Sequence, residues 1–564
     1  MRQNIYISQP PRTQRNIKKK SLFPLSLLLF LLLLPIVLWI SEGNEFTSAI
    51  QFIFSKKNIV RYDTYTISLD ETISQEYRES IEESLDRLEL DGKKRFEIKD
   101  KGADIQLSRE KSDDAKEISG KDLIPVGHLY SLLNSVQENE LDAYSVFVVN
   151  SVYREYLKDE YNLNASVLNS YSDLVSKLEE NDSNVGLIDF DDLDYKVKIL
   201  EVGGKHYLED EEAAIPIRLY ATLKKGVDQF ILSVLSKNID IDNSYWNREQ
   251  LVKVNMSGVV AMSRGLAIKI DNSGDSAYPA REIGTFLADA DLTHVSNEVS
   301  FVPNCRSYSG MSFCSRPEYI ETLKESGVDI VELTGNHNND FGAQYSADSI
   351  ELYKSLGMRY FGGGLDEKDA SEILYEELKG STVAFIGYNY YDTIHRSLAL
   401  AGESRAGANS WSESKMKSDI EKAKEKGDVV IVTFQFQECY SYPASDVIYP
   451  ICYKPLSNPD QSAVFRKAID FGADIVVGTQ AHQPQTFEIY ADGVIFYGLG
   501  NLYFDQSMWI GTRQGLVLSH YFYNGKHIQT RMVPIYTDRD LIPRLATQEQ
   551  GDLLMRLLLE ARDY

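Results

Sequence analysis

The chain has 564 residues, 43% of them hydrophobic and 25% charged, so it is too long for one ordinary core and predicts two or more globular domains. Its formal net charge is −25, although residues 1–20 carry six basic side chains and no acidic one. The remainder therefore carries about −31, and so acidic a surface repels phosphate backbones, which excludes nucleic acid as a partner.

An apolar segment follows the basic tail and runs from Leu22 to Ile40. At about 1.5 Å per residue it would be roughly 28 Å long as a helix, close to the thickness of a bilayer core. We therefore expect a cytoplasmic tail over 1–20 and a single transmembrane anchor in the cell membrane over 21–41, with the bulk of the chain extracellular. A cleaved signal peptide is the alternative, although its apolar region would normally be shorter.

A first α/β domain is expected over residues 60–248. It combines a helical stretch with strand-like stretches, at 75–90 and at 145–150, 184–189 and 197–202. The passage Asn184-Val-Gly-Leu-Ile-Asp-Phe-Asp-Asp-Leu193 weakly resembles a passage in the second lobe of periplasmic solute-binding proteins. The resemblance implies a small bound solute, whereas the residues themselves show no catalytic spacing. His128 and His206 are more typical of surface or core histidines than of ligands.

The second region, residues 251–545, repeats one unit made of an amphipathic helix, a short apolar strand and a polar loop. The expected strands are 292–295, 328–333, 428–434 and 473–477. This alternation predicts an α/β sheet with helices on both faces. Ligands of open α/β sheets bind beyond the carboxyl ends of the strands, so we expect the polar loops to converge on one site.

The polar loops contain side chains that can bind metal or move protons. These are Glu298, Asn336, His337, Asp340 and His482. A histidine can serve as a general acid near neutral pH, and such groups hold the ions of two-metal hydrolases. Each also has a plainer interpretation, as a hydrogen-bonded structural histidine, a turn or a solvated carboxylate. Their equivalent positions at strand ends favour a shared site.

Six blocks of the second region resemble the CapA family of capsule and poly-gamma-glutamate synthesis proteins in order and spacing. The blocks are 257–264, 296–298, 334–342, 435–440, 478–485 and 496–506. The resemblance implies a C-terminal metallophosphoesterase-like α/β sandwich over 251–545. It also implies two kinds of partner, a surface polymer or its precursor and a membrane-embedded polymer synthesis machinery.

Three positions depart from the family pattern. Val259 replaces a metal-binding Asp, and Gln435 and Gln480 replace histidines. Valine offers no lone pair, and amide oxygens are weaker ligands for transition metals than imidazole or carboxylate. Two alternatives therefore remain for the cofactor, one divalent metal ion or none.

The resemblance assigns roles to the remaining positions of these blocks. His337 is the expected acid, and the expected metal ligands are Glu298, Asn336 and His482. The expected substrate contacts are Arg264, Asp340, Gln435, Gln480, Gln485, Asn501 and Asp505. The glutamines would suit an amide- or hydroxyl-rich polymer, or they fill a decayed cleft.

Three functions stay open at this point. The first is a membrane-anchored CapA-like protein that serves synthesis, attachment or export of a surface polymer, with a partly degenerate metal site. The second is a metal-dependent extracellular hydrolase or phosphoesterase. The third is a polymer- or solute-binding module without catalysis. Whether the protein is an enzyme is therefore undecided by its sequence.

The four cysteines form two close pairs, Cys305 with Cys314 and Cys439 with Cys452. Neither pair has the CxxC spacing of a zinc knuckle. Outside the cell two local disulfides are expected, each closing a loop of roughly 10 to 14 residues. Four free buried thiols are the alternative.

Overall fold

The computed structural model of the protein describes residues 64–563, with gaps at 72, 74, 91–92, 211–212, 240–245, 307–309 and 437–459. The expected cytoplasmic tail, the anchor over 21–41 and the Cys439–Cys452 pair lie outside the described residues. Among the helices of the described part, none combines the length and the apolar character needed to cross a bilayer.

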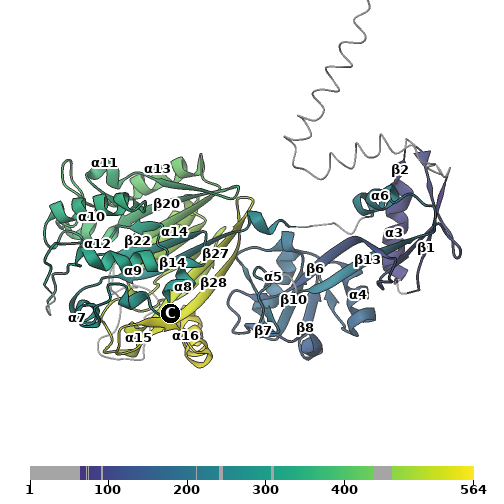
Figure 1. The fold of residues 1–564 in the computed structure, drawn as a ribbon, viewed down its shortest axis with the longest axis horizontal. Helices are drawn as coiled ribbons and strands as arrows, with labels where there is room; N and C mark the ends of the chain where they lie inside the picture. The colour runs from purple at the N-terminus through teal and green to yellow at the C-terminus, as the bar shows by residue number, and fades with distance from the viewer. Residues whose placement is uncertain are drawn as a thin grey trace, which may run out of the picture.

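One mixed sheet dominates the first region (Figure 1). Its strand order is β4-β1-β5-β13-β6-β10-β8-β9, with β11 also paired to β6. The strands of this sheet are β1 Tyr65–Leu69, β4 Phe96–Ile98, β5 Ile105–Ser108, β6 Lys116–His128, β8 Ser145–Val148, β9 Ser166–Val167, β10 Asn184–Ile188, β11 Val197–Ile199 and β13 Ile215–Leu223. The short pairs are β2 Glu89–Leu90 with β3 Lys93–Lys94, and β7 Ser135–Val136 with β12 Glu201–Val202. The helices are α3 Gln75–Arg87, α4 Ser151–Tyr161, α5 Tyr171–Glu179 and α6 Phe230–Asn238.

The long strands β6 and β13 pair antiparallel and hold the first sheet together. Buried and half-buried side chains alternate along β13, the two-residue period of a strand that buries one face. The predicted helix at 75–90 and the strands near 145, 184 and 197 are confirmed as α3, β8, β10 and the consecutive strands β11 and β12.

The second region contains two large sheets. One has the order β17-β16-β15-β14-β27-β28-β29, with β26 also on β14, and the other has the order β19-β20-β22-β23-β25-β24. The strands of the first are β14 Val252–Val260, β15 Leu292–Asn297, β16 Ile330–Glu332, β17 Arg359–Phe361, β26 Asn501–Tyr503, β27 Gln514–Tyr523, β28 Lys526–Thr537 and β29 Pro543–Leu545. Those of the second are β19 Leu374–Leu378, β20 Ser381–Asn389, β22 Val429–Gln435, β23 Ile475–Gly478, β24 Phe487–Tyr490 and β25 Gly493–Phe496. A two-stranded pair joins β18 Gly363–Gly364 to β21 Gly407–Ala408.

The helices of the second region lie around the two sheets (Figure 1). They are α7 Arg264–Ser273, α8 Gly284–Ala288, α9 Ile320–Glu325, α10 Ala343–Ser355, α11 Glu367–Ala370, α12 Tyr390–His395, α13 Glu413–Lys424, α14 Gln461–Asp470, α15 Ile510–Arg513 and α16 Gln548–Glu560.

Three apolar clusters make the second region a four-layer sandwich. The central cluster joins side chains of both sheets, for example Met256 of β14 and Ile431 of β22. Two outer clusters pack α7 to α10 on the first sheet and α13 with α14 on the second. Every residue of β22 is buried, as expected for a parallel strand covered on both faces.

The sandwich corrects one part of the sequence prediction. The helix–strand alternation alone predicts an α/β sheet with helices on both faces, whereas the structure has two sheets that face each other and carry helices outside, the sandwich that the family resemblance implies. Helix–strand alternation does not reveal which strands pair, because buried strands of either sheet are apolar throughout. Helix α16, which lies beyond the expected boundary at residue 545, also belongs to the sandwich and contributes Leu554 and Leu558 to the central cluster.

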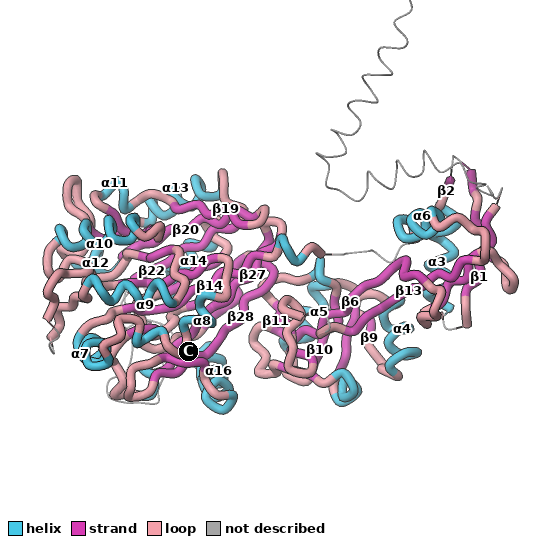
Figure 2. The backbone as a smooth tube through the Cα atoms, in the orientation of Figure 1, coloured by secondary structure: helices cyan, strands magenta, loops and turns pink. Residues whose placement is uncertain are grey.

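The two regions contact each other where β11 lies beside β28 (Figure 2). The Trp246 ring stacks on Phe190 of the first region with a centroid distance of 4.6 Å and meets Tyr523 of the second edge-on. Arg531 of β28 forms an ion pair with Glu201 at 2.8 Å. The junction therefore combines aromatic packing with charge pairing.

Candidate functional site

The loops that follow the central strands of both sheets meet at one edge of the sandwich. Glu298 follows β15, whereas Asn336 and His337 follow β16, the neighbouring strand. A bridge pairs Val299 with His337, and a Cβ atom at Gly335 would lie only 2.3 Å from the Cα of Glu298. The two loops are therefore in direct contact, as the sequence predicts.

His337 and Asp340 form a hydrogen-bonded pair in the loop after β16. The Nδ1 atom of His337 lies 2.7 Å from the Oδ2 atom of Asp340, and both side chains are largely buried. Burial opposes the charged imidazole, but the hydrogen bond to Asp340 and the nearby Glu298 carboxylate outweigh it, so the pKa of His337 is raised. The pair resembles the base–orienter arrangement of a histidine acid.

Arg264 and Asp505 form a second pair beside His337. The Nε atom of Arg264 donates to Asp505 Oδ1 at 3.0 Å, and the Gly265 amide donates to the other carboxylate oxygen at 2.9 Å. Arg264 has a φ of 47°, in the left-handed region, where backbone strain is typical of functional sites. Its guanidinium lies over the rings of Phe313 and Phe504, at 4.6 and 4.7 Å.

The two aromatic rings complete a wall that the sequence analysis missed. Phe313 lies 4.1 Å from the His337 ring, and its amide donates to Asp340 at 2.7 Å. Phe504 stacks on the His482 ring at 5.1 Å. Phe313 directly precedes Cys314, so its place in the cysteine loop was the available signal.

His482 approaches the same wall from the loop after β23. Its Nδ1 atom lies 2.8 Å from Asn501 Oδ1, and the Asn501 amide donates to the Thr512 carbonyl at 3.0 Å. This bond fixes the orientation of the His482 ring. Asn501, Asp505 and Asp340 therefore contact other site residues, and their expected roles in substrate binding stay predictions.

The glutamines occupy the second sheet and are almost fully buried. Gln435 ends β22, and Gln480 follows β23, the adjacent strand, in which Gly478 pairs with Phe434. Gln435 is 2% exposed, and its Oε1 atom has no hydrogen-bond partner in the part of the chain that the structure describes. Gln485 is 1% exposed, and its backbone N–H donates to the Gly498 carbonyl at 2.9 Å. The sequence thus placed Gln435 and Gln480 at the strand ends, while Gln485 reads as an interior residue.

Glu332 links the loops of the two sheets through hydrogen bonds in the protein interior. It is fully buried at the end of β16 and accepts hydrogen bonds from Thr334 and, at 2.8 Å, from Thr479. Its other oxygen lies 3.1 Å from His294 Nε2. Thr334 leads to Asn336, and Thr479 leads to Gln480, so one carboxylate fixes the starting points of both loops.

A disulfide between Cys305 and Cys314 holds the loop that carries Phe313. This prediction is therefore confirmed, while the expected Cys439–Cys452 bond lies outside the described residues. The closed loop spans a sequence separation of 9, so the bond removes part of the entropy of the unfolded chain.

We expect the double change Cys305→Ser and Cys314→Ser to lower the free energy of unfolding by about 2–3 kcal/mol, because a loop of this size loses that restriction. Denaturant titration of the purified protein measures the difference. The single change Cys305→Ser should cost about as much, because either substitution breaks the bond. An unchanged midpoint would contradict the stabilising role.

The residues at this site do not fit a two-metal centre. Val259, buried on β14 between Ser296 and Asn501, offers no donor atom where the family resemblance implies a carboxylate. No group of three or more His, Cys, Asp or Glu side chains suited to a metal ion occurs in the described residues. Amide oxygens at Asn336 and Gln435 suit a hard cation better than zinc or iron. We therefore derive no catalytic step through a metal.

Comparison with known proteins assigns the family. Residues 253–506 match the family described as bacterial capsule synthesis protein PGA_cap. The C-terminal half of this chain is a CapA-family domain. The resemblance drawn from the six sequence blocks is thus confirmed, and the α/β sandwich suits the metallophosphoesterase-like fold expected for the family.

Two relatives carry the family name. The capsule biosynthesis protein CapA of Bacillus anthracis is 28% identical over 289 residues, which cover 50% of this chain and 66% of that protein. The PGA biosynthesis protein CapA of Bacillus subtilis is 29% identical over 276 residues, 48% of this chain and 68% of that protein. The chain thus spans about two thirds of each relative, and the similarity corresponds to the CapA-family domain.

Solved structures add no further assignment. An ABC-type phosphate transport receptor from Vibrio cholerae covers 33% of this chain and 100% of its own at 13% identity, with a TM-score of 0.24. The NAD nucleotidase of Haemophilus influenzae covers 55% of this chain and 63% of its own at 9% identity, with a TM-score of 0.31. Such low scores carry no argument, so the solute-binding character of residues 60–248 stays a prediction.

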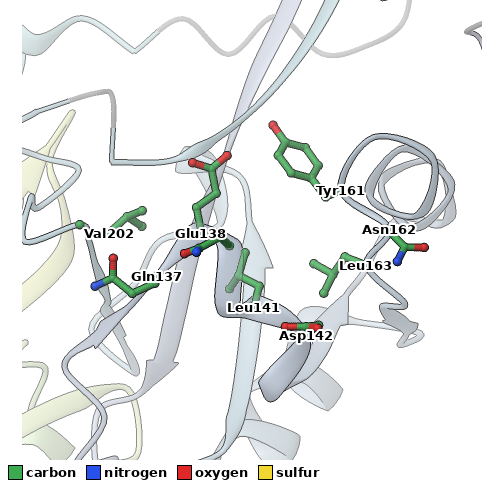
Figure 3. A pocket seen from close by; sticks show the side chains of 10 residues that line it. Gln137, Glu138, Leu141, Asp142, Tyr161, Asn162, Leu163 and Val202 are labelled. Atoms are coloured by element: carbon green, nitrogen blue, oxygen red, sulfur yellow. The ribbon is translucent and has the colours of Figure 1, made fainter.

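A pocket of about 550 Å³ lies in the first region, remote in sequence from the CapA-family domain (Figure 3). Glu138 and Asp142 line it together with Tyr161 at the end of α4. Both carboxylates are exposed to solvent, so they need no bound cation for stability. The pocket therefore gives no independent support to a solute site in this region.

Proposed function

We propose that this protein is a membrane-anchored extracellular CapA-family protein that acts in synthesis, attachment or export of a capsule or poly-gamma-glutamate-type surface polymer. The observation that carries the proposal is a CapA-family domain that keeps the His337–Asp340 pair but has Val259, Gln435 and Gln480 at former ligand positions. The site is thus a partly degenerate metal site that binds polymer in place of two-metal hydrolysis.

Two features support an extracellular, anchored domain. The Cys305–Cys314 disulfide suits an oxidising compartment. The apolar segment 21–41 behind a basic tail suits a single membrane span with a cytoplasmic N-terminus. The proposed partners are therefore the lipid bilayer, through this segment, and a polymer synthesis machinery embedded in the same membrane.

Buried acceptor oxygens support recognition of an amide-containing polymer. Gln435 Oε1 and Asn336 Oδ1 are buried, and neither has a hydrogen-bond partner among the described residues. A buried acceptor without a donor is costly, so a ligand that supplies N–H groups would gain from both. Phosphate oxygens cannot donate in this way, which disfavours a phosphodiester as the ligand.

We expect Gln435→Ala to weaken binding of poly-gamma-glutamate by about tenfold, because one amide hydrogen bond is lost in a buried site. Pull-down of the purified extracellular part with immobilised polymer measures it. Gln344→Ala, on the exposed start of α10, is the matched control and should bind normally. Equal binding by Gln435→Ala, or failure of the unmodified protein to bind polyglutamate or capsular polysaccharide, would contradict the proposal.

The intact His337–Asp340 pair favours one further candidate, an extracellular hydrolase in which His337 donates a proton. Because the pKa of His337 is raised, its protonated form persists to higher pH, and acid-dependent activity would fall as pH rises through that pKa. Glu298 stabilises the imidazolium by its charge.

Under the polymer-binding proposal we expect elemental analysis to find no stoichiometric pair of metal ions. We also expect a phosphodiesterase assay with added manganese to detect no hydrolysis. Removing Glu298, Asn336 and His482 should then leave the activity baseline unchanged. Stoichiometric metal together with hydrolysis that is lost in His337→Ala and kept in the exposed control His395→Ala would establish the hydrolase instead.

A further inference from the structure

A second pocket, of about 440 Å³, lies at the junction of the two regions. Its first wall comes from β11, β12 and the loop before β7, and its second wall from β28 and α16. The volume lies within the range of about 300–1000 Å³ that is usual for small-molecule sites. The pocket is separate in sequence from the loops around His337.

Lys198 of β11 provides a positive charge in this pocket. Its Nζ atom donates to the Ser131 carbonyl at 2.5 Å and to Asn134 Oδ1 at 2.8 Å, both neutral acceptors. Within the described residues it forms no ion pair with a carboxylate. Burial lowers the pKa of Lys198 to about 8, although Asp182 and Asp552 oppose the shift. An ammonium group in such surroundings would gain from an added anion.

Asp552 of α16 provides a negative charge on the opposite wall. It is half-buried, and the described residues offer it neither an ion pair nor a side-chain hydrogen bond. The field of Asp552 reaches Lys198, yet no salt bridge joins the two within 4.0 Å. Opposite charges thus face each other across the pocket without contact.

The rest of the lining restricts the ligand further. Arg531 is already paired with Glu201 at 2.8 Å and with Glu209 at 3.5 Å, so it offers no unpaired positive charge at the rim. The lining is mixed: its apolar members are Leu129, Ile199, Met532, Val533 and Met555, and polar side chains such as Gln529 and Thr547 make up much of the rest. A lone anion would leave Asp552 without an opposite charge in contact, and a lone cation would leave Lys198 without one.

We propose that this junction pocket binds a free α-amino acid with an apolar side chain, whose carboxylate contacts Lys198 and whose ammonium group contacts Asp552. A zwitterion satisfies both charges at once, and its side chain fills the apolar part of the pocket. Because each region contributes one of the two charged contacts, the bound ligand joins the two regions. The site is independent of the polymer-binding function proposed above.

Isothermal titration calorimetry of the purified extracellular part at pH 8 tests this site with L-leucine and L-methionine. The half-ligands 4-methylpentanoate and 3-methylbutylamine carry one charge each and should bind at least tenfold more weakly. A ligand carboxylate beside Lys198 raises its pKa, so binding should take up protons, which two buffers of different ionisation heat reveal.

Asp552→Asn and Lys198→Met should each weaken L-leucine binding at least tenfold, and Lys198→Met should also abolish the proton uptake. The control Lys526→Met lies at the exposed start of β28 and should bind normally. Asp552→Asn changes a half-buried helix residue and keeps its volume, so it reports on binding even where Lys198→Met fails to fold.

Three outcomes would overturn the proposal. The unmodified protein does not bind either amino acid at millimolar concentration, 4-methylpentanoate binds as tightly as leucine, or Asp552→Asn leaves the affinity unchanged. The second outcome would identify a plain carboxylate site in which Asp552 has no part.

Discussion

Replacing Glu332 with alanine is expected to lower the free energy of unfolding by about 3–5 kcal/mol. The carboxylate is fully buried and accepts hydrogen bonds from Thr479 and Thr334, and its second oxygen bonds His294. Alanine would leave these polar groups without a partner in an interior that water does not reach. Urea titration followed by tryptophan fluorescence measures the loss.

The matched variants separate this effect from a general loss of charge. Glu332→Gln keeps the volume and one acceptor oxygen, so it should lose clearly less than alanine. Glu351→Ala removes a carboxylate that is exposed on α10 and pairs with the neighbouring Lys354, and should change stability by less than about 0.5 kcal/mol. If Glu332→Ala stayed within that same range, the network would have no structural importance.

A second large effect is expected from acidification between pH 6.5 and 5. Burial lowers the pKa of His206 and of His527 to about 3 and that of His128 to about 4, and it holds the pKa of His520 well below its ordinary value. Nearby Arg531 and Lys253 add to the effect at His206. All four imidazoles thus stay neutral in the folded protein.

The direction in which the unfolding free energy changes with pH follows from the number of protons that each state binds. Above about pH 6.5 a histidine is neutral in both states and contributes nothing to the pH dependence. Below it the unfolded chain binds a proton that the folded chain excludes, so stability falls by about 1.4 kcal/mol per pH unit for each histidine until its folded pKa is reached. At pH 5 the cost is about 2 kcal/mol per histidine. His337, with a raised pKa, acts in the opposite direction.

Unfolding free energies measured from pH 7.5 to 5 should therefore show a steep decline. His206→Gln removes one titrating group and should lower the slope by about 1.4 kcal/mol per pH unit. His395→Gln, at an exposed position on α12, should leave the slope unchanged. A stability that stays flat down to pH 5 would show that these imidazoles reach solvent or take up protons while folded.

The sequence predicted the parallel strands and their loops well, for a physical reason. Short apolar runs such as Asp428–Phe434 and Ala473–Val477 are too short for a typical helix and rich in valine and isoleucine, which favours buried strands, and they appear as β22 and β23. The pairing of these strands was not predictable, because uniformly apolar strands carry no mark of the sheet they join. The contacts that decide which strands pair form only in the complete fold.

The candidate site shows the same division. His337, Asp340 and Glu298 were found because polar residues stand directly after apolar strands. Phe313 was missed because it lies in a long loop with no periodicity, where the disulfide and the bond of its amide to Asp340 hold it beside His337. Glu332 was missed because it lies inside an apolar run that predicts core packing. Its role becomes visible only when Thr479, 147 residues away, is in contact with it.

Helix α16 has a consequence for the order in which this domain forms during synthesis. Leu554 and Leu558 pack into the central cluster between the two sheets, and Thr486 donates a hydrogen bond to the Leu558 carbonyl at 2.7 Å. The strands that these residues cover are translated earlier. The space between the sheets can therefore close only after residues 548–560 have joined it, and until then the apolar interior of the sandwich stays exposed.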